Sequence, residues 1–263
     1  MEPLEGKKSR YGMAIDLDRC TGCGSCMVAC AVENNVAPAE ERADTNTGTT
    51  WLRVYPLEGG RKNGAQDVAF VPMFCQHCEH ETPCITVCPQ NAVDIDPLTG
   101  IVGQIPQRCL GCRYCMTACP YHARSFNWWD PRWPEGMEQT LNPDVAPRMR
   151  GVVEKCNFCH ARLHAARAKA AIAGSREIAP EDYVPACVES CPAQAIIFGD
   201  LADPASEVAR RARSPEAFRF LASLGTEPKI YYTSTRTWVR EKAEHPVESG
   251  QRVGAPAESP VGA

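Results

Sequence analysis

The sequence lacks long apolar segments. None of its apolar runs approaches the length of about 18 residues that marks a transmembrane helix. It also shows no secretion signal of its own. We therefore expect no direct membrane span.

Bulky apolar residues are scarce. Leu, Ile, Val and Phe together make up 47 of the 263 residues, which is below the roughly one fifth at which disorder becomes a concern. The net charge is only −4, so the high charge that accompanies disorder is missing. We infer that the chain folds and that inorganic material replaces part of an apolar core.

Other functional signals are absent as well. No basic stripe carries interleaved aromatic residues, so we expect no nucleic-acid binding. No Ser–His–Asp arrangement, nucleotide-binding loop or isolated carboxylate pair stands out. The sequence therefore indicates a protein that is not catalytic on its own.

Cysteine, in contrast, is abundant, and its spacing is the strongest signal in the chain. The 16 cysteines fall into four groups: Cys20-x2-Cys23-x2-Cys26-x3-Cys30, Cys75-x2-Cys78-x5-Cys84-x3-Cys88, Cys109-x2-Cys112-x2-Cys115-x3-Cys119, and Cys156-x2-Cys159 followed much later by Cys187-x3-Cys191. The first and third groups match the bacterial ferredoxin run, in which the fourth cysteine ligates the other cluster of a pair. The pattern predicts four [4Fe–4S] clusters, with all sixteen cysteines as iron ligands, and a role in conducting electrons.

The spacing has a physical basis. Three cysteines at i, i+3 and i+6 on a tight loop can hold three corners of one cubane. In the first group, Gly22 lets the backbone come close to the cluster because it has no side chain. The fourth cysteine starts the next segment and serves the neighbouring cluster, and in the other three groups a proline follows it: Pro89, Pro120 and Pro192.

Other interpretations of the cysteines fit less well. Zinc sites typically use separated C-x2–4-C pairs rather than triple runs, and cysteines three apart on a loop form strained disulfides. Three histidines, His77, His80 and His122, lie beside the cysteine groups. Four cysteines per cluster already saturate the irons, which leaves a hydrogen bond to a cluster sulfur as the open role for a histidine.

Short strands and turns surround the cysteine groups. We expect strands at 13–17, 68–71, 92–95, 101–105, 123–126, 151–153 and 195–198, another around 51–55, and a helix over 160–173 that ends at Gly174. The predicted fold class is α+β, with two ferredoxin-like dicluster modules, the second inserted into the first, and irregular extensions.

The expected domain boundaries follow from this repeat. Residues 11–35 plus 150–200 would form the module with clusters one and two, and residues 68–128 the module with clusters three and four. Residues 36–67 and 129–149 would be insertions, and 201–263 a C-terminal extension whose composition from about residue 245 onward predicts a mobile tail or a strap.

Several stretches beyond the cysteines carry further information. They are Met13 to Arg19 before Cys20, Ala118 to Tyr121, and Pro185 through Leu201. These stretches resemble the iron–sulfur subunits of the complex iron–sulfur molybdoenzymes, over about residues 11–240. The segments 126–128, 141–145 and 154–156 are similar to the equivalent parts of menaquinone reductase and alternative complex III, which belong with polysulfide reductase in this group. One departure is visible: five residues separate Cys78 from Cys84, where the family usually has four.

The resemblance implies a pairing of the ligands. Cluster one would take Cys20, Cys23, Cys26 and Cys191; cluster two Cys30, Cys156, Cys159 and Cys187; cluster three Cys75, Cys78, Cys84 and Cys119; and cluster four Cys88, Cys109, Cys112 and Cys115.

The resemblance also implies partners and a location. In the family, cluster one faces a molybdopterin-type catalytic subunit, and cluster four faces a polysulfide-reductase-type integral membrane subunit with a quinone site. Such subunits commonly reach the periplasm with a partner that carries the export signal. We therefore expect a peripheral position on the bacterial inner membrane, with the periplasmic face favoured and the cytoplasmic face compatible.

Three hypotheses of function remain at this stage. The first is a non-catalytic electron-transfer subunit of a quinone-linked respiratory complex. The second is a soluble polyferredoxin that diffuses as a carrier. The segments 36–67, 128–150 and 200–263 favour the first, because a diffusing carrier has little use for long extensions. The third is a structural zinc scaffold.

Overall fold

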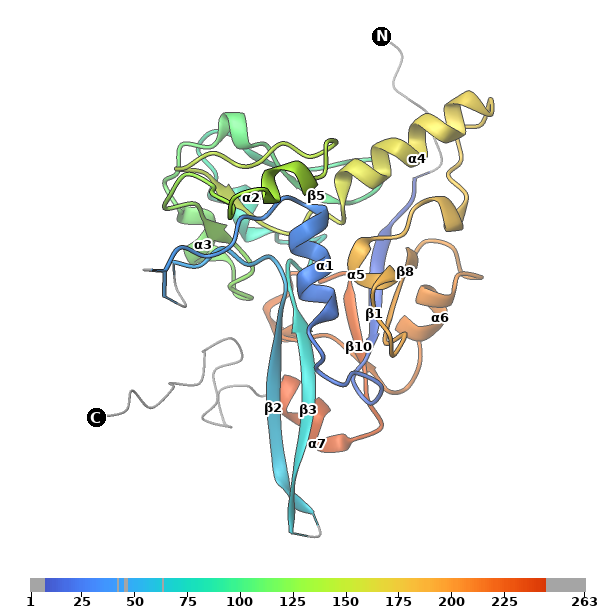
Figure 1. Ribbon diagram of the computed structural model, residues 1–263. Coiled ribbons are helices and arrows are strands. Elements are labelled where there is room, and N and C mark those ends of the chain that lie inside the picture. Colours follow the sequence, from blue (N-terminus) through green and yellow to red (C-terminus); the bar gives the residue numbers. More distant parts are fainter. Residues whose placement is uncertain (1–7, 42, 45–46, 63, 245–263) are drawn as a thin grey trace, which may run out of the picture.

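The structure is a computed structural model that describes residues 8–41, 43–44, 47–62 and 64–244 (Figure 1). The strands are β1 (Tyr11–Asp16), β2 (Arg53–Lys62), β3 (Ala65–Met73), β4 (Val93–Ile95), β5 (Val102–Gln104), β6 (Ser125–Phe126), β7 (Val153–Glu154), β8 (Ile196–Asp200), β9 (Ala217–Phe218) and β10 (Ile230–Thr233). The helices are α1 (Ser25–Glu33), α2 (Pro83–Thr86), α3 (Tyr114–Ala118), α4 (His160–Ile172), α5 (Ala186–Glu189), α6 (Glu207–Ala212) and α7 (Thr237–Glu244), with 3-10 turns at Pro106–Arg108, Met137–Thr140, Pro180–Asp182 and Ala222–Leu224. This mixture confirms the α+β class.

The largest sheet brings distant parts of the chain together. Its strand order is β8-β1-β10-β9, with β1 antiparallel to β8 and parallel to β10. The side chains of Met13, Ile15, Ile230 and Tyr232 on its central strands are fully buried. The segment before the first cysteine, residues 11–16, and the segment after the last cysteine are thus held in one sheet.

The C-terminal extension differs from the irregular segment expected. Residues 201–244 contain α6, β9, β10 and α7. The run Ile230–Thr233 favours a strand, since its residues are β-branched or aromatic, and it pairs with β1. The expectation of an irregular extension is therefore wrong for this part, while the predicted tail from residue 245 lies outside the described residues.

A long hairpin of β2 and β3 extends away from the body of the molecule (Figure 1). The strands expected at 51–55 and 68–71 are its inner parts, and the hairpin continues outward through an irregularity between Glu58 and Arg61. Helix α7 packs against β2. The Trp238 ring lies where a Cβ of Gly59 would be, so the glycine allows the indole to rest on the backbone.

Two small antiparallel sheets, β4–β5 and β6–β7, frame the segment between Cys84 and Cys156. The strands predicted at 92–95, 101–105 and 123–126 are present, each with fewer residues. Strand β7 pairs with β6, so residues 153–154 lie with the segment 68–128. The nesting of one module inside the other stays a prediction.

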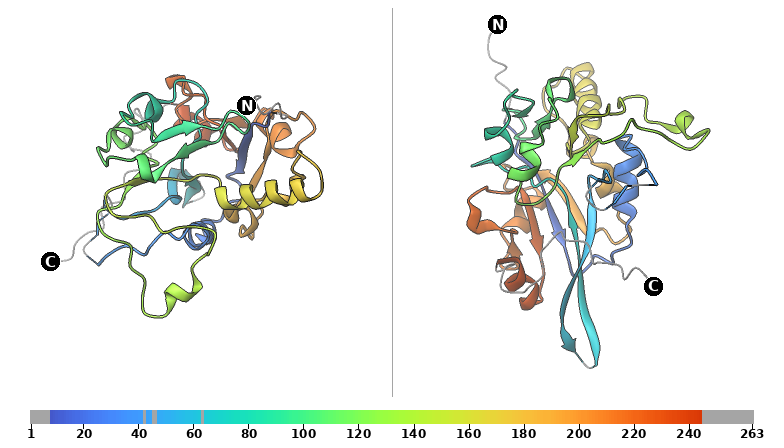
Figure 2. Two further views of the ribbon diagram at one scale, coloured as in Figure 1. Left: turned by 90° about the horizontal axis from the view of Figure 1, so that it is seen from above. Right: turned by 90° about the vertical axis from the view of Figure 1, so that its left-hand side faces the viewer.

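Helix α4 confirms the helix predicted at 160–173, and Gly174 follows it in the left-handed region at φ 73°. Figure 2 shows the helix along one edge of the molecule, with the irregular 129–149 arm projecting beyond the body. The basic side chains of α4 pair with carboxylates from several segments: Arg162 with Glu33 and Glu189, Arg167 with Asp96, and Lys169 with Asp182.

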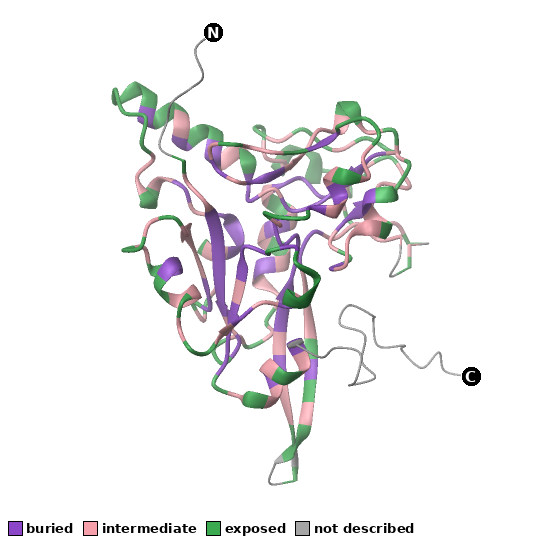
Figure 3. Cartoon of the chain, turned by 180° about the vertical axis from the view of Figure 1, so that it is seen from behind, coloured by how far each residue is buried: buried purple, intermediate pink, exposed green. Residues whose placement is uncertain are grey.

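Buried residues run along the strands of the main sheet and through the interior of the molecule (Figure 3), and several cysteines are among the buried residues. The large core around the main sheet includes Cys26, Cys30, Cys75, Cys156 and Cys187. The smaller core between α2, α3 and the short sheets consists of Cys84, Val93, Val102, Cys115 and Val153. In the described part of the chain, no helix combines the length and the apolar character needed to span a bilayer.

Candidate iron–sulfur centres

The structure brings the sixteen cysteines into four sets, and the first set lies in a surface hollow. Cys20, Cys23, Cys26 and Cys191 line this hollow together. Cys20 and Cys23 come from the loop that enters α1, Cys26 lies in the first turn of α1, and Cys191 follows α5. Cys23 is exposed, whereas Cys26 is buried. We call these four residues set one.

A second surface hollow holds Cys88, Cys109, Cys112 and Cys115, which we call set four. Here the loop before α3 supplies Cys109 and Cys112, α3 itself supplies Cys115, and the segment after α2 supplies Cys88. Cys112 is exposed and Cys115 is buried. Sets one and four are thus built alike, each from one ferredoxin-type loop and one distant cysteine.

Backbone amides point at several thiols. Ala195 donates to Cys191 Sγ at 3.3 Å, and Ala92 donates to Cys88 Sγ at 3.2 Å. Both donors follow their cysteine by four residues, which repeats one local geometry in sets one and four. Hydrogen bonds to cluster sulfurs are one of the means by which a protein sets a reduction potential.

The two ferredoxin-type loops depend on a glycine at the same place. Gly22 and Gly111 have φ 72° and 73°, a region that favours glycine. A Cβ at Gly22 would collide with the Phe70 ring, and one at Gly111 would collide with the Gly151 carbonyl oxygen. Both loops therefore pack tightly against the chain behind them, while the close approach of Gly22 to a cluster stays a prediction.

Set two consists of Cys30, Cys156, Cys159 and Cys187, and all four are buried. Burial, followed by the neighbouring Cys156 and Cys187, raises the pKa of the Cys30 thiol well above its ordinary value. Thiols in such a place ionise when they bind metal, because a bound thiolate must release its proton.

Asn34 is the polar partner of set two. This buried residue follows α1, and its Nδ2 donates to Cys30 Sγ at 3.9 Å and to Cys159 Sγ at 3.8 Å. The same amide donates to the Cys30 carbonyl at 3.0 Å. The sequence analysis missed Asn34, although its position four residues after Cys30 was a usable signal.

Set three consists of Cys75, Cys78, Cys84 and Cys119. Burial, and then the nearby Cys75, raises the pKa of Cys78 to about 12. The extra residue before Cys84 lies in an exposed turn at 79–81, where Glu81 has φ 42°. Cys84 lies in the first turn of α2 and is buried. The longer loop therefore does not separate Cys84 from the other cysteines of set three.

The thiols of neighbouring sets act on one another in the order one, two, three and four. Burial raises the pKa of Cys187 most, the other thiols of set two raise it next, and Cys26 of set one adds a further contribution. Burial and then Cys75 of set three raise the pKa of Cys156 in set two to about 12. Cys84 of set three raises the pKa of Cys115 in set four, where burial again acts first. Set one therefore adjoins set two, set two adjoins set three, and set three adjoins set four.

A stacked pair of rings lies between sets two and three. The centroids of His77 and Phe158 are 3.7 Å apart at an interplanar angle of 17°. His77 is fully buried, and its Nδ1 accepts a hydrogen bond from the Val102 amide at 3.1 Å. This histidine thus bonds to the backbone, whereas His80 and His122 are exposed.

Buried cations surround this pair. Burial lowers the pKa of His77 well below its usual value, with contributions from Lys155, Lys229 and Arg124. Lys155 Nζ donates to the carbonyls of Val102 and Cys156 at 2.5 and 2.8 Å. Lys155 was noted in the sequence only as part of the segment 154–156, and neither its burial nor that of Arg124 and Lys229 was predicted.

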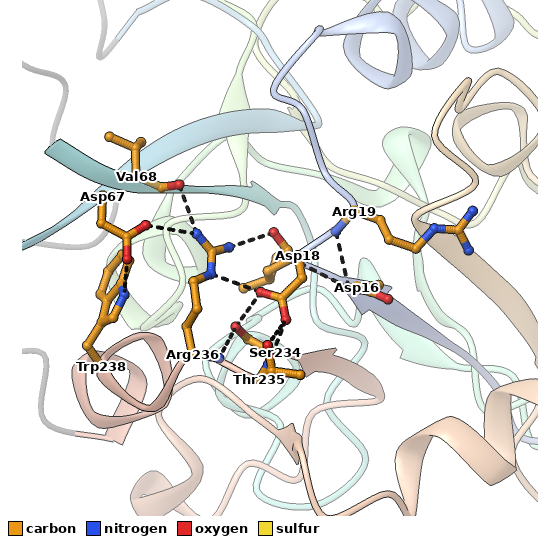
Figure 4. Close-up of polar contacts among 10 residues, drawn as sticks. Asp16, Asp18, Arg19, Asp67, Val68, Ser234, Thr235, Arg236 and Trp238 are labelled. Carbon is orange, nitrogen blue, oxygen red and sulfur yellow. Dashed lines mark hydrogen bonds and ion pairs between the residues drawn. The ribbon is translucent and has the colours of Figure 1, made fainter. Parts of the chain in front are cut away.

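The C-terminal segment holds the chain that leads into set one (Figure 4). The Asp18 carboxylate accepts hydrogen bonds from Ser234, Thr235 and Arg236, and these bonds lower its pKa to about 2 despite partial burial. Arg236 also donates to the carbonyls of Leu17 and Val68. Asp67 accepts from Trp238 Nε1 at 2.8 Å. The end of the described chain thus fixes both the set-one loop and β3.

The donor sets fit [4Fe–4S] clusters. Each set offers four thiols, and thiolates are the ligands that these clusters take. The hollow of set one is lined mainly by its cysteines and by small or apolar residues, and that of set four by its cysteines, by apolar residues and by Gln90, Gln104 and Arg113. Within the described residues, no three His, Cys, Asp or Glu side chains converge tightly enough for a single metal ion.

Known protein families and relatives match this arrangement. Two family models, each described as a 4Fe-4S dicluster domain, match residues 19–92 and 66–133. The chain is 50% identical over 250 residues to the iron–sulfur cluster-binding subunit of menaquinone reductase from Nitratidesulfovibrio vulgaris, a match that spans 94% of this chain and 98% of the relative. It is 39% identical to an iron–sulfur subunit of an Hdr-like menaquinol oxidoreductase from Archaeoglobus fulgidus, over 86% and 84% of the two chains.

A third relative has a different named activity. The chain is 32% identical to the iron–sulfur subunit of the arsenate respiratory reductase from a Shewanella species, over 85% of this chain and 95% of the relative. Relatives with different named activities thus share nearly the whole chain.

Proposed function

This chain belongs to the iron–sulfur electron-transfer subunits of molybdoenzyme-type oxidoreductase complexes and carries four [4Fe–4S] clusters, and we propose that it connects a molybdopterin-type catalytic subunit to a quinone-binding membrane anchor of the polysulfide-reductase type. When bound, such clusters accept and release electrons. The chain itself is not catalytic.

We further propose that each of the four sets holds one cluster. Cluster one would be held by set one, cluster two by set two, cluster three by set three and cluster four by set four. The shared hollows of sets one and four support this assignment, as does the mutual influence of thiols within sets two and three.

The linear order of the sets, with exposed cysteines only at its ends among the described residues, is the observation that carries the proposal. Cys23 in set one and Cys112 in set four are exposed, and every other cysteine is partly or fully buried. A conductor between two partners needs two accessible ends and a shielded interior. Sets one and four meet the first requirement, and set two meets the second most fully.

Both ends carry exposed apolar side chains. Leu110 and Tyr114, on either side of Cys112, are 65% and 63% exposed, and Val28, two residues after Cys26, is 66% exposed. Exposed apolar side chains around a site are typical of a protein interface, so each end is suited to meet a partner. The polarity itself rests on the family resemblance, and on that basis we assign the set-four end to the membrane anchor and the set-one end to the catalytic subunit.

Two matched substitutions in the assembled complex test this polarity. Cys112→Ser replaces a thiolate of set four with a harder ligand that suits iron–sulfur clusters less well. Electron exchange with quinone should slow strongly, while exchange between the catalytic subunit and a soluble redox dye should survive. Cys23→Ser should disturb the opposite end. Equal loss of dye and quinone activity from Cys112→Ser, in a complex with its other irons in place, would show that the polarity is wrong.

The location follows from the proposed anchor. The subunit would sit peripherally on the bacterial inner membrane, on the periplasmic face, held by its partners. Protease treatment of spheroplasts tests the side: digestion of the subunit in intact spheroplasts supports the periplasmic face, and digestion only after lysis supports the cytoplasmic face.

A further inference from the structure

A buried guanidinium lies between sets three and four. Arg124 follows the third cysteine group and directly precedes β6, and it is only 5% exposed. Its Nη1 donates to Gln104 Oε1 at 2.8 Å. Its Nη2 has no hydrogen-bond partner among the described residues.

This charge has no carboxylate partner. Among the ion pairs of the described residues none involves Arg124. A buried charge without a partner is strongly unfavourable, and an arginine cannot escape by losing its proton. An anionic group other than a carboxylate must therefore face the Arg124 guanidinium.

The groups that face Arg124 are cysteines of two sets. Burial works against the charged guanidinium, but neighbouring thiols raise its pKa: Cys84 and Cys115 first, then Cys75 and Cys119. Cys84, Cys75 and Cys119 belong to set three, and Cys115 belongs to set four. The guanidinium is thus close enough to both sets to act on their thiols, and its hydrogen-bond partner Gln104 lines the set-four hollow.

We propose that Arg124 tunes electron transfer. Its buried positive charge lies between set three and set four and raises the reduction potential of both. The proposal rests on the ligand sets assigned under the proposed function. Adding one electron at either set adds one negative charge there. A nearby cation stabilises the reduced form, and net charge is one of the factors that set cluster potentials.

The size of the effect follows from Coulomb's law. At an effective dielectric constant of about 20, a unit charge within about 12 Å changes the ratio of reduced to oxidised form about tenfold. The burial of Arg124 keeps water from screening this charge.

Set one offers an internal reference. Burial and the other set-one thiols raise the pKa of Cys20 and Cys26, and a backbone amide lowers each. No described arginine or lysine is among these strongest causes. A substitution at Arg124 should therefore leave the potential of set one unchanged.

The test is a redox titration of the full-length, iron-loaded protein, in which electron paramagnetic resonance measures the reduced form of each cluster. Arg124→Gln should lower the ratio of reduced to oxidised form at set three or set four at least tenfold at a fixed potential, a shift of about 59 mV for a one-electron couple. Arg124→Lys, which keeps the positive charge, should keep most of the wild-type ratio of reduced to oxidised form. Arg108→Gln removes an exposed charge next to Cys109 and should have little effect because water screens it.

A second variant tests the charge without removing the arginine. Gln104→Glu places a carboxylate at the atom that Arg124 already contacts and should lower the same potentials. Unchanged potentials in both Arg124→Gln and Gln104→Glu, with full iron content, would overturn the role of Arg124. They would leave the proposed function intact if quinone activity is normal. A shift confined to set one or set two would likewise overturn it.

Discussion

The outer cysteine sets, one and four, and the inner sets, two and three, use the same ligand in different surroundings. Each outer set lies in a surface hollow and has an exposed cysteine, Cys23 or Cys112. The inner sets have none, and the stacked rings of His77 and Phe158 lie between them. The position of a set along the line, rather than its ligand type, therefore decides whether a partner can reach it.

The comparison also separates two physical roles. Inner-set thiols such as Cys75 and Cys156 pack among the apolar side chains of the main core, where Cys26 is the buried member from an outer set, whereas Cys84 of set three lies in the smaller core. Iron at these sets would contribute to folding, since burying thiols that bind no metal leaves cavities and polar groups without partners. The outer sets are supported mainly by short loops and by contacts such as those of Arg236 with the segment before Cys20.

Removal of all iron should have the largest effect and should abolish the difference between outer and inner sets. With an apolar core this small, the chain should lose most of its folded structure when an oxidant and a chelator strip the clusters. Circular dichroism and calorimetry measure the loss. A cluster-free sample that keeps the native spectrum and a sharp thermal transition would contradict this expectation.

Single ligand substitutions should reveal the difference. Cys156→Ser, in a fully buried inner set, should prevent accumulation of the folded protein. Cys112→Ser, in an outer set, should leave a folded chain that loses at most about four of about sixteen irons. Soluble yield and iron content per chain are the measurements. Equal yields and equal iron loss would show that burial does not divide the sets.

A substitution far from the thiols should affect only one end. Arg236→Ala removes hydrogen bonds to Asp18, Leu17 and Val68 and should lower the stability of the loaded protein by about 2 kcal/mol. The spectrum of set one should broaden, while that of set four should not. Arg240→Ala is the matched control, because Arg240 makes a single, long bond to the Pro215 carbonyl at 3.3 Å. Equal destabilisation by both variants would contradict the role of the Asp18 network.

The smallest effect should appear within an inner set. Asn34→Ala removes the donor to Cys30 and Cys159 and should lower the potential of set two by about 40 mV, the equivalent of about 1 kcal/mol for one hydrogen bond. Asn35→Ala is the control, since Asn35 bonds to the 142–145 backbone and not to a thiol. A potential that moves equally in both variants would show that packing, and not the hydrogen bond, matters.

Much of this arrangement could be predicted from the sequence because cysteine spacing and strand patterns are local. The loops at Cys20 and Cys109, the helix at 160–173 and the short strands around the cysteines were accessible in this way. The parallel pairing of β10 with β1 was not, because it joins residues 13 and 230 and a four-residue strand carries no information about its partner. The buried cations were missed for a similar reason: nothing in a single sequence shows that Arg124 lies between two sets of cysteines.

The most direct test of the account is the accessibility of each cluster in the full-length, iron-loaded protein. A water-soluble paramagnetic ion complex speeds the relaxation of nearby clusters, and electron paramagnetic resonance can assign the signals with the help of Cys23→Ser and Cys112→Ser. The account predicts strong enhancement at sets one and four and weak enhancement at sets two and three. Equal enhancement at all four sets, or the strongest enhancement at an inner set, would contradict it.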